Sequence, residues 1–158
     1  MTATTRTPAR QPRIELERRF AVPLRRGFDY ITDPANWPEY WPGLIGVEHA
    51  ARWREPGDRA RLVLRLLGRP VALDMTLTRL EPYRLVEYTS VQRGLPAVRH
   101  ERHFAADGDG FRYRLVVQFA ARSGLRGAFD RLLVVRATQR AMRQTLDTLD
   151  RRLGAQDS

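Results

Sequence analysis

A series of alternating segments, followed by one long amphipathic helix, limits the folds open to this chain. Six segments between residues 44 and 121 alternate apolar and polar side chains, with short turns such as "REPGD", "EPYR" and "DGDG" between them. A period of two is the pattern of a half-buried strand, and short turns favour antiparallel neighbours. A further alternating segment, "RIELERRFAV", precedes the six. The sequence therefore predicts seven antiparallel strands.

Residues 125–153 follow a different period. Their apolar side chains recur at alternating steps of three and four, which predicts one face of a helix about 40 Å long. Gln139 is the one polar member of this stripe. The stripe consists of Leu125, Ala128, Leu132, Val135, Gln139, Met142, Leu146, Leu149 and Leu153.

Two short helices are expected between the first strand and the rest. The segment "PLRRGFDYI" begins with a proline suited to the first position of a helix. The prolines of the next stretch, "DPANWPEYWPG", allow at most one or two further helical turns. The order of elements is then strand, two short helices, six strands and one long helix.

This order predicts an α+β helix-grip fold, in which a curved sheet wraps around the C-terminal helix. The sheet has one apolar face to bury, and strong twist allows it to curl around a single helix. One helix cannot fill the whole concave face, so we expect an interior space there. Trp37, Tyr40 and Trp41 would rim or plug its mouth, held by the prolines between them.

Length and composition favour one domain that is not built for nucleic acid. We expect residues 13–154 to form the domain, with tails at 1–12 and 155–158. The net charge is +10, but all 28 basic residues are arginine, which is typical of a GC-rich coding bias. In residues 122–152, eight arginines face three aspartates around a helix, as on a solvated surface. Peripheral contact with a membrane and the oligomeric state are left open.

The sequence offers no sign of a membrane span, a signal peptide or disulfide chemistry. No apolar run approaches the ~20 residues that a span needs, and no apolar block follows the N-terminus. The chain contains no cysteine. A cytoplasmic protein of bacterial type is the expectation that fits these features best.

Three stretches of the chain resemble the START-like superfamily, also called SRPBCC. They are "IELERRFAVPLRRGFDYITDPANWPEYWPG", "LEPYRLVEY" and "HERHFAADGDGFRYRL", and the resemblance extends over about residues 13 to 153. The superfamily includes polyketide cyclase/dehydrase and lipid-transport families. The resemblance implies a hydrophobic ligand held between sheet and C-terminal helix. It implies no shared nucleophile or metal ligand.

Strand parity predicts which polar groups face that space. If "DGDG" forms a tight loop at Gly108–Asp109, the flanking strands pair in a defined register. Because alternate residues share a face, the apolar side of residues 111–119 then identifies the inward residues of the preceding strand. The predicted pairs are Phe104 with Tyr113, Arg102 with Leu115, and His100 with Val117.

The register of the strand before these is less constrained. A four-residue loop over Arg93–Pro96 would place Glu87 opposite Arg102 and Thr89 opposite His100. A slip of one residue would place Tyr88 and Ser90 on the inner face instead. Both registers stay open at this point.

Four residues are candidates for catalysis: His100, Arg102, Tyr113 and Glu87. Arg102 could polarise a carbonyl or bind an enolate, His100 could transfer a proton near neutral pH, and Tyr113 could bind a ligand oxygen. The same residues also suit structural roles, such as a buried arginine–glutamate pair and a hydrogen-bonded histidine. His100 and His103 face opposite sides of a strand, so we expect no metal and no cofactor.

The candidate ligand contacts come from the strands, the long helix and the tryptophan-rich stretch. The leading hypothesis is binding or transport of a small hydrophobic molecule, such as a lipid, a polyketide or an isoprenoid. The alternative is a cyclase/dehydratase, which leaves open whether a reaction is catalysed, and a second alternative is an arginine-mediated interaction module. The candidate contacts are Trp37, Trp41, Leu64, Met75, Thr89, His100, Arg102, Phe104, Tyr113, Leu115, Val117, Phe119, Val135, Gln139 and Met142.

Overall fold

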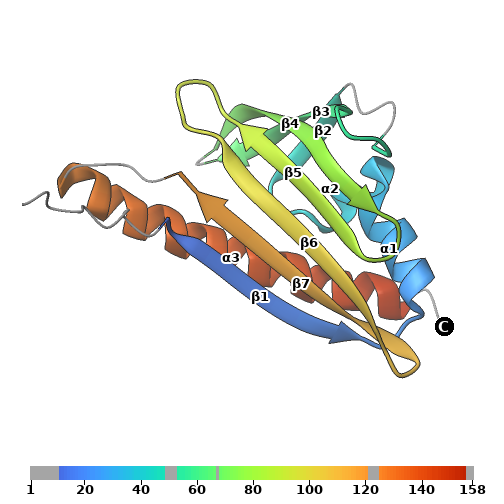
Figure 1. Ribbon diagram of the computed structural model, residues 1–158. Helices are drawn as coiled ribbons and strands as arrows, with labels where there is room; N and C mark the ends of the chain where they lie inside the picture. The colour runs from blue at the N-terminus through green and yellow to red at the C-terminus, as the bar shows by residue number, and fades with distance from the viewer. Residues whose placement is uncertain (1–10, 49–52, 67, 121–124, 156–158) are drawn as a thin grey trace, which may run out of the picture.

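The computed structural model describes residues 11–48, 53–66, 68–120 and 125–155, and the side chains of 66 and 125–131 are not described. Seven strands form one antiparallel sheet in the order β1-β7-β6-β5-β4-β3-β2, and a long helix follows them (Figure 1). The predicted fold class is confirmed. The elements are β1 (Arg13–Phe20), α1 (Leu24–Thr32), the 3-10 turn η1 (Pro34–Asn36), α2 (Trp37–Tyr40), β2 (Leu44–Glu48), β3 (Arg59–Leu66), β4 (Arg69–Glu81), β5 (Leu85–Val91), β6 (Val98–Asp107), β7 (Gly110–Phe119) and α3 (Leu125–Ala155).

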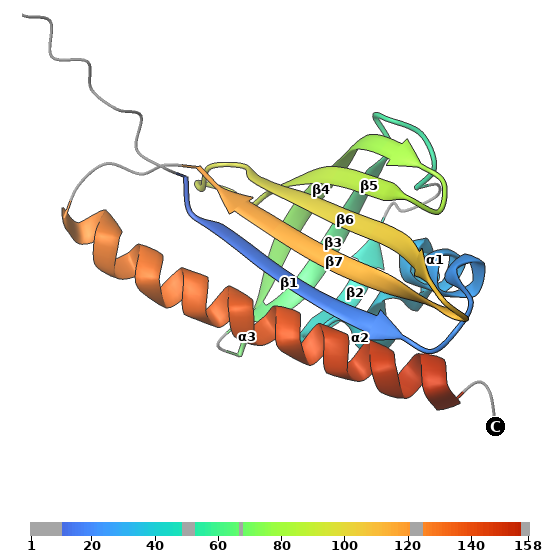
Figure 2. The same ribbon diagram turned by 60° about the horizontal axis from the view of Figure 1, so that its bottom comes forward.

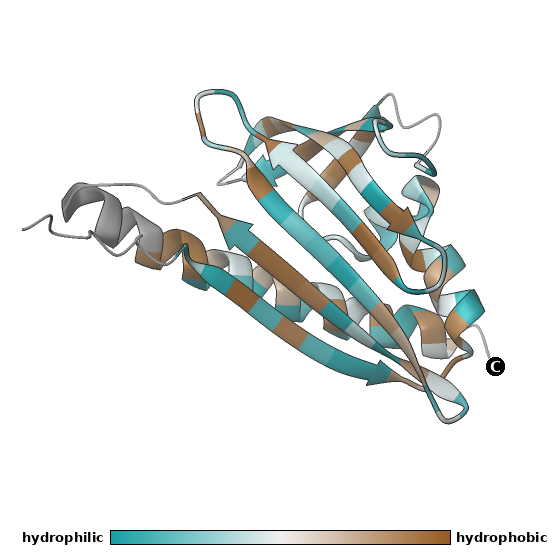
Figure 3. Cartoon of the chain, in the orientation of Figure 1, coloured by the Kyte–Doolittle hydropathy of each residue, from teal (hydrophilic) through white to brown (hydrophobic). Residues whose placement is uncertain are grey.

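The alternating pattern of the strands separates the two faces of the sheet. Hydrophobic and hydrophilic residues alternate along β1, as the sequence predicts (Figure 3). The apolar members point to the concave face, where they join one core cluster with the helices. In the described part of the chain, no helix is long and apolar enough to cross a membrane.

The C-terminal part of α3 covers the concave face, but its N-terminal part does not. Met142, Leu146 and Leu149 are buried, which confirms this part of the predicted stripe. Leu132 is 49% exposed, so the N-terminal part of the stripe does not pack on the sheet. The reason is length, since the N-terminal turns of α3 reach past the start of β1 (Figures 1 and 2). Leu125 and Ala128 lie outside the described side chains.

Helices α1 and α2 close the opposite end of the sheet. Helix α1 lies so close to β7 that a Cβ placed on Gly27 would be 2.1 Å from the ring of Phe111. Pro23 precedes the first helical residue rather than occupying it. Asp33 then begins η1 by accepting a hydrogen bond from the Ala35 amide. Helix α1 therefore packs closely against β7 at this end of the molecule.

The register between β6 and β7 is the predicted one, with His100, Arg102 and Phe104 opposite Val117, Leu115 and Tyr113. Of the two alternatives left open between β5 and β6, the structure has the one that places Tyr88 and Ser90 on the inner face. Val86 lies opposite Arg102 and Tyr88 opposite His100, because pairing begins only at Ser90 and Val98. Pro96 cannot donate to the ladder, and the connection is accordingly longer than four residues.

The observed β5–β6 register places two of the candidate site residues on the convex face. Glu87 does not pair with Arg102. Its carboxylate accepts a hydrogen bond of 3.1 Å from Arg99 instead. Thr89 lies opposite Arg99 and shares this face with Glu87, because alternate residues of a strand point the same way.

Candidate functional site

One rim of the concave face is formed by apolar side chains that are only half-buried. These residues come from four strands and α3, and they lie at the end of the sheet away from α1. From this rim, polar groups lead inward along β5 and β6, first Ser90 hydrogen-bonded to His100 and then Tyr88 hydrogen-bonded to Arg102. The half-buried apolar residues of the rim are Leu64, Leu73, Val98, Phe119 and Val135.

Arg102 is the most unusual residue of this row, because it is a charged side chain only 4% exposed. One terminal nitrogen donates to the Ile31 carbonyl at 3.3 Å and to the Tyr40 hydroxyl at 3.4 Å. The other donates to the Tyr88 hydroxyl at 3.1 Å. Ile31 lies in the last turn of α1, where unpaired carbonyls make a helix end negative. The helix terminus thus supplies part of the missing counter-charge.

Aromatic rings enclose the same guanidinium. Its central carbon lies 5.1 Å from the ring centre of Tyr88, 5.4 Å from Trp41 and 5.9 Å from Trp37. Their faces stabilise a cation, and more so where water is excluded. Trp37 and Tyr40 are themselves fixed, since both donate hydrogen bonds to the Ile31 carbonyl at 3.1 and 2.7 Å.

The contacts of Arg102 nevertheless leave it incompletely satisfied. Among the described residues, no carboxylate pairs with it, and its Nε atom is buried without a hydrogen-bond partner. Burial acts to lower the pKa of Arg102, but the tyrosines around it outweigh that effect and the guanidinium stays protonated. Burial also raises the pKa of Tyr40 to about 12, although Arg102 acts in the opposite direction. The cluster therefore carries an uncompensated positive charge.

His100 lies between Arg102 and this rim as a neutral imidazole. Its ring stacks on Tyr88 with centres 4.6 Å apart, and its Nε2 is 2.7 Å from the Ser90 hydroxyl. Burial lowers the pKa of His100 to about 3, and the charge of Arg102 acts in the same direction. A neutral imidazole can accept or donate a hydrogen bond, but it adds no second charge to the site.

Tyr113 lies beside this cluster with an unused hydroxyl. It is 1% exposed and packs against Phe104 and Phe20. Burial raises its pKa, and Arg102 is close enough to act against that rise. Within the described residues its hydroxyl has no hydrogen-bond partner. A buried phenol in this state is well suited to bind an oxygen atom of a ligand.

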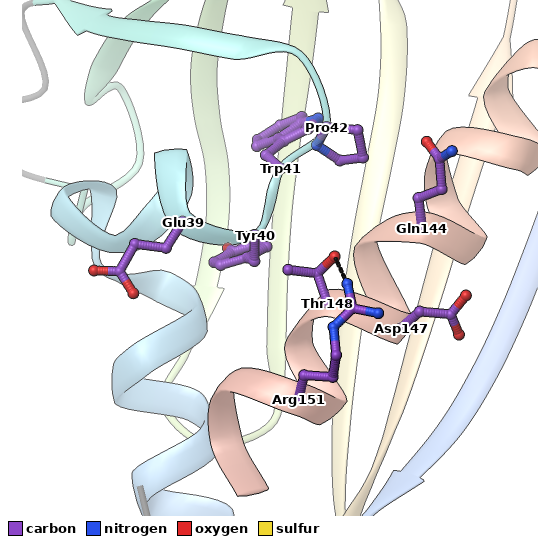
Figure 4. Close-up of a pocket in the computed structure, with 8 residues that line it drawn as sticks. All are labelled: Glu39, Tyr40, Trp41, Pro42, Gln144, Asp147, Thr148 and Arg151. Atoms are coloured by element: carbon purple, nitrogen blue, oxygen red, sulfur yellow. Dashed lines mark hydrogen bonds between the residues drawn. The ribbon is translucent and has the colours of Figure 1, made fainter. Parts of the chain in front are cut away.

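A separate pocket of about 350 Å³ opens between α2 and α3, on the other side of Trp41 (Figure 4). Tyr40, Trp41 and Pro42 form one wall, and polar side chains of α3 form the other. Tyr40 and Trp41 line this pocket, which is not the predicted space on the concave face, and Trp37 is fully buried. The lining residues are Glu39, Tyr40, Trp41, Pro42, Gln144, Asp147, Thr148 and Arg151.

The predicted site residues fall into four groups. His100, Arg102, Tyr113, Trp37 and Trp41 lie together, while Glu87 and Thr89 lie on the convex face. Leu64, Phe119, Val135 and Gln139 are half-buried. Those buried in the core are Met75, Phe104, Leu115, Val117 and Met142.

The sequence did not identify Ile31 or Trp53 as part of the cluster. Trp53 is buried, with its ring centre 5.4 Å from that of Trp37 and 5.8 Å from that of Tyr88. Its position next to the "REPGD" turn concealed it, because a residue outside a strand has no defined parity. The Ile31 carbonyl belongs to the backbone and carries no signal in the residue types.

A curved antiparallel sheet around a long C-terminal helix defines the helix-grip fold. The sequence matches the family "Polyketide cyclase / dehydrase and lipid transport" over residues 11–154. The chain belongs to this family. No curated protein matches its sequence.

Solved structures with the same fold share little sequence with this chain. The Zhui aromatase/cyclase from Streptomyces sp. R1128 superposes with a TM-score of 0.78 at 15% identity, covering 94% of this chain and 97% of that one. TTHA0849 from Thermus thermophilus gives 0.76 at 21% identity, covering 93% and 100%. Ara h 8.0201 gives 0.71 at 14%, covering 92% and 99%. At these identities the likeness extends to the fold alone.

Proposed function

We propose that this protein binds a small hydrophobic molecule bearing an oxygen acceptor on the concave face of its sheet. The observation that carries the proposal is the order of groups leading inward from the rim. Half-buried apolar side chains form the rim, neutral His100 follows, and buried Arg102 and Tyr113 lie beyond it, Arg102 with an Nε donor that has no partner in the described part of the chain. A ligand with an apolar body and a carbonyl, carboxylate or enolate oxygen matches this order. The family, which includes lipid-transport proteins, supports the same class of ligand.

The first test blocks the rim. V98W places a large ring on the concave rim. The control V91W adds the same ring at the same end of the sheet, but at a position that is 43% exposed. Binding of the neutral fluorescent probe N-phenyl-1-naphthylamine should weaken about tenfold or more in V98W and stay unchanged in V91W. Equal binding by both variants would remove the concave face as the site.

The second test concerns the oxygen acceptor. R102M retains an apolar side chain but removes the charge, so affinity for the anionic probe 8-anilinonaphthalene-1-sulfonate should fall more than affinity for the neutral probe. Electrostatic and hydrogen-bond contributions of a buried arginine make a tenfold difference the expected scale. If R102M loses affinity for both probes equally, the charge of Arg102 does not contribute to binding, and its side chain only shapes the site.

A cyclase or dehydratase is the second candidate, favoured by the unused Tyr113 hydroxyl beside a buried cation. Such a pair could stabilise an enolate oxygen while neutral His100 moves a proton. The fold neighbour that is an aromatase/cyclase adds support by analogy. Y113F and H100Q separate the two functions, since a carrier keeps most of its affinity whereas an enzyme loses turnover far more than binding.

A further inference from the structure

The N-terminal part of α3 carries an apolar turn that the protein leaves uncovered. Leu132, Leu133 and Val134 are 49%, 54% and 48% exposed. With Val135 they complete one full helical turn made only of apolar side chains. A helix that is apolar all round is normally covered on every side, by protein or by lipid.

The position of Leu133 around the helix axis can be compared with that of buried Met142. Successive helical residues are about 100° apart, so Leu133 lies about 180° from buried Met142. It therefore points directly away from the sheet and cannot serve the core. Arg140 lies only about 20° from the direction of Leu133, two turns further along.

The surroundings of the apolar turn are strongly basic. Between Leu132 and Leu146 the chain contains Arg136, Arg140 and Arg143 but no aspartate or glutamate. All three arginines are exposed. A second copy of a chain of charge +10 would bring like charges together here, which opposes self-association. An anionic surface with an apolar interior complements both features.

A second element presents the same combination at the same end of the molecule. The β5–β6 connection carries exposed Arg93 and Leu95, the latter 45% accessible. Both views place this connection and the N-terminal part of α3 at the end of the sheet where β7 finishes (Figures 1 and 2). That is also the end where Val98 and Phe119 are half-buried.

We propose that this end of the protein docks on an anionic lipid bilayer, with Leu132–Val134 and Leu95 entering the interface and the arginines contacting lipid phosphates. Arginine suits this position, because its stem packs among acyl chains while its head reaches the phosphates. The docked orientation turns the rim of the concave face toward the lipid. The inference does not depend on a ligand being bound there.

Co-sedimentation with vesicles tests the proposal on the full chain. Binding should require phosphatidylglycerol mixed into phosphatidylcholine and should be lost in 0.5 M NaCl, where the screening length is only about 4 Å. R136Q/R140Q should weaken binding about thirtyfold, since each basic residue near an anionic surface contributes about fivefold. L133D and L95Q should each weaken it about tenfold.

Matched controls lie elsewhere on the surface. I45Q alters an equally exposed apolar residue on edge strand β2, and R25Q/R84Q removes two arginines beside Tyr83 at the α1 end. These variants should bind as the parent does, and circular dichroism should show every variant folded. Absence of binding to anionic vesicles, or equal losses in test and control variants, would overturn the proposal. So would a dimer in sedimentation velocity that L133D dissociates, because the patch would then be a self-interface.

Discussion

Replacing Arg102 with methionine should change the free energy of unfolding by less than about 1.5 kcal/mol. The charge is held by three hydrogen bonds, two of them at the long end of the range at 3.3 and 3.4 Å. Together with the aromatic faces, these contacts contribute a few kcal/mol at most. Desolvating a guanidinium without a carboxylate costs several kcal/mol, so this cost nearly cancels the favourable free energy of the contacts. Methionine fills the apolar space and leaves only the Tyr88 hydroxyl without its partner, at a cost of about 1 kcal/mol.

Urea denaturation followed by tryptophan fluorescence measures this difference, with R102A as the control. Alanine removes the side-chain stem and leaves a cavity, so R102A should be less stable than the parent by about 2–5 kcal/mol. If R102M lost more than about 3 kcal/mol, the charge itself would be fastening α1 and α2 to the sheet. Arg102 would then be a structural residue, and its place in the proposed binding site would lose its physical basis.

Three smaller predictions concern other parts of the fold. Because the pKa of His100 is about 3 in the folded protein and about 6.5 when unfolded, its contribution to stability should be lost as pH falls from 6.5 toward 3. In denaturation curves, the drop in unfolding free energy from pH 7 to pH 5 should be smaller for H100Q than for the parent. G110A should destabilise the fold by about 2–3 kcal/mol, because its Cβ would lie 2.0 Å from the Phe20 carbonyl oxygen. In G154A the new Cβ would have no atom within 4 Å, and alanine favours the helix more than glycine, so the melting temperature should rise slightly. A lower melting temperature for G154A would contradict the helix geometry.

The architecture could be predicted because its signals are repetitive and local. Alternation along each strand fixes two faces, and the "DGDG" turn fixes the β6–β7 register to the residue. The β5–β6 register has no comparable turn, since its connection contains a single glycine and a proline that cannot pair. One residue of slip exchanges Glu87 for Tyr88 on the inner face, and with it an ion pair for an aromatic contact. The sequence left this register open, so it could predict the fold but not the chemistry around Arg102.

The surroundings of Arg102 explain why residue types could not reveal this site. Its counter-charge is divided among a backbone carbonyl at the end of α1, two tyrosine hydroxyls and three aromatic faces, which come from α1, α2, β5 and the residue after α2. A paired carboxylate would have satisfied the charge and would have to be displaced by any anionic ligand. A diffuse, incomplete set of partners has no such competitor, and the buried Nε has no hydrogen-bond partner among the described residues. The same absence that makes Arg102 costly to bury is the reason we propose that it binds a ligand oxygen.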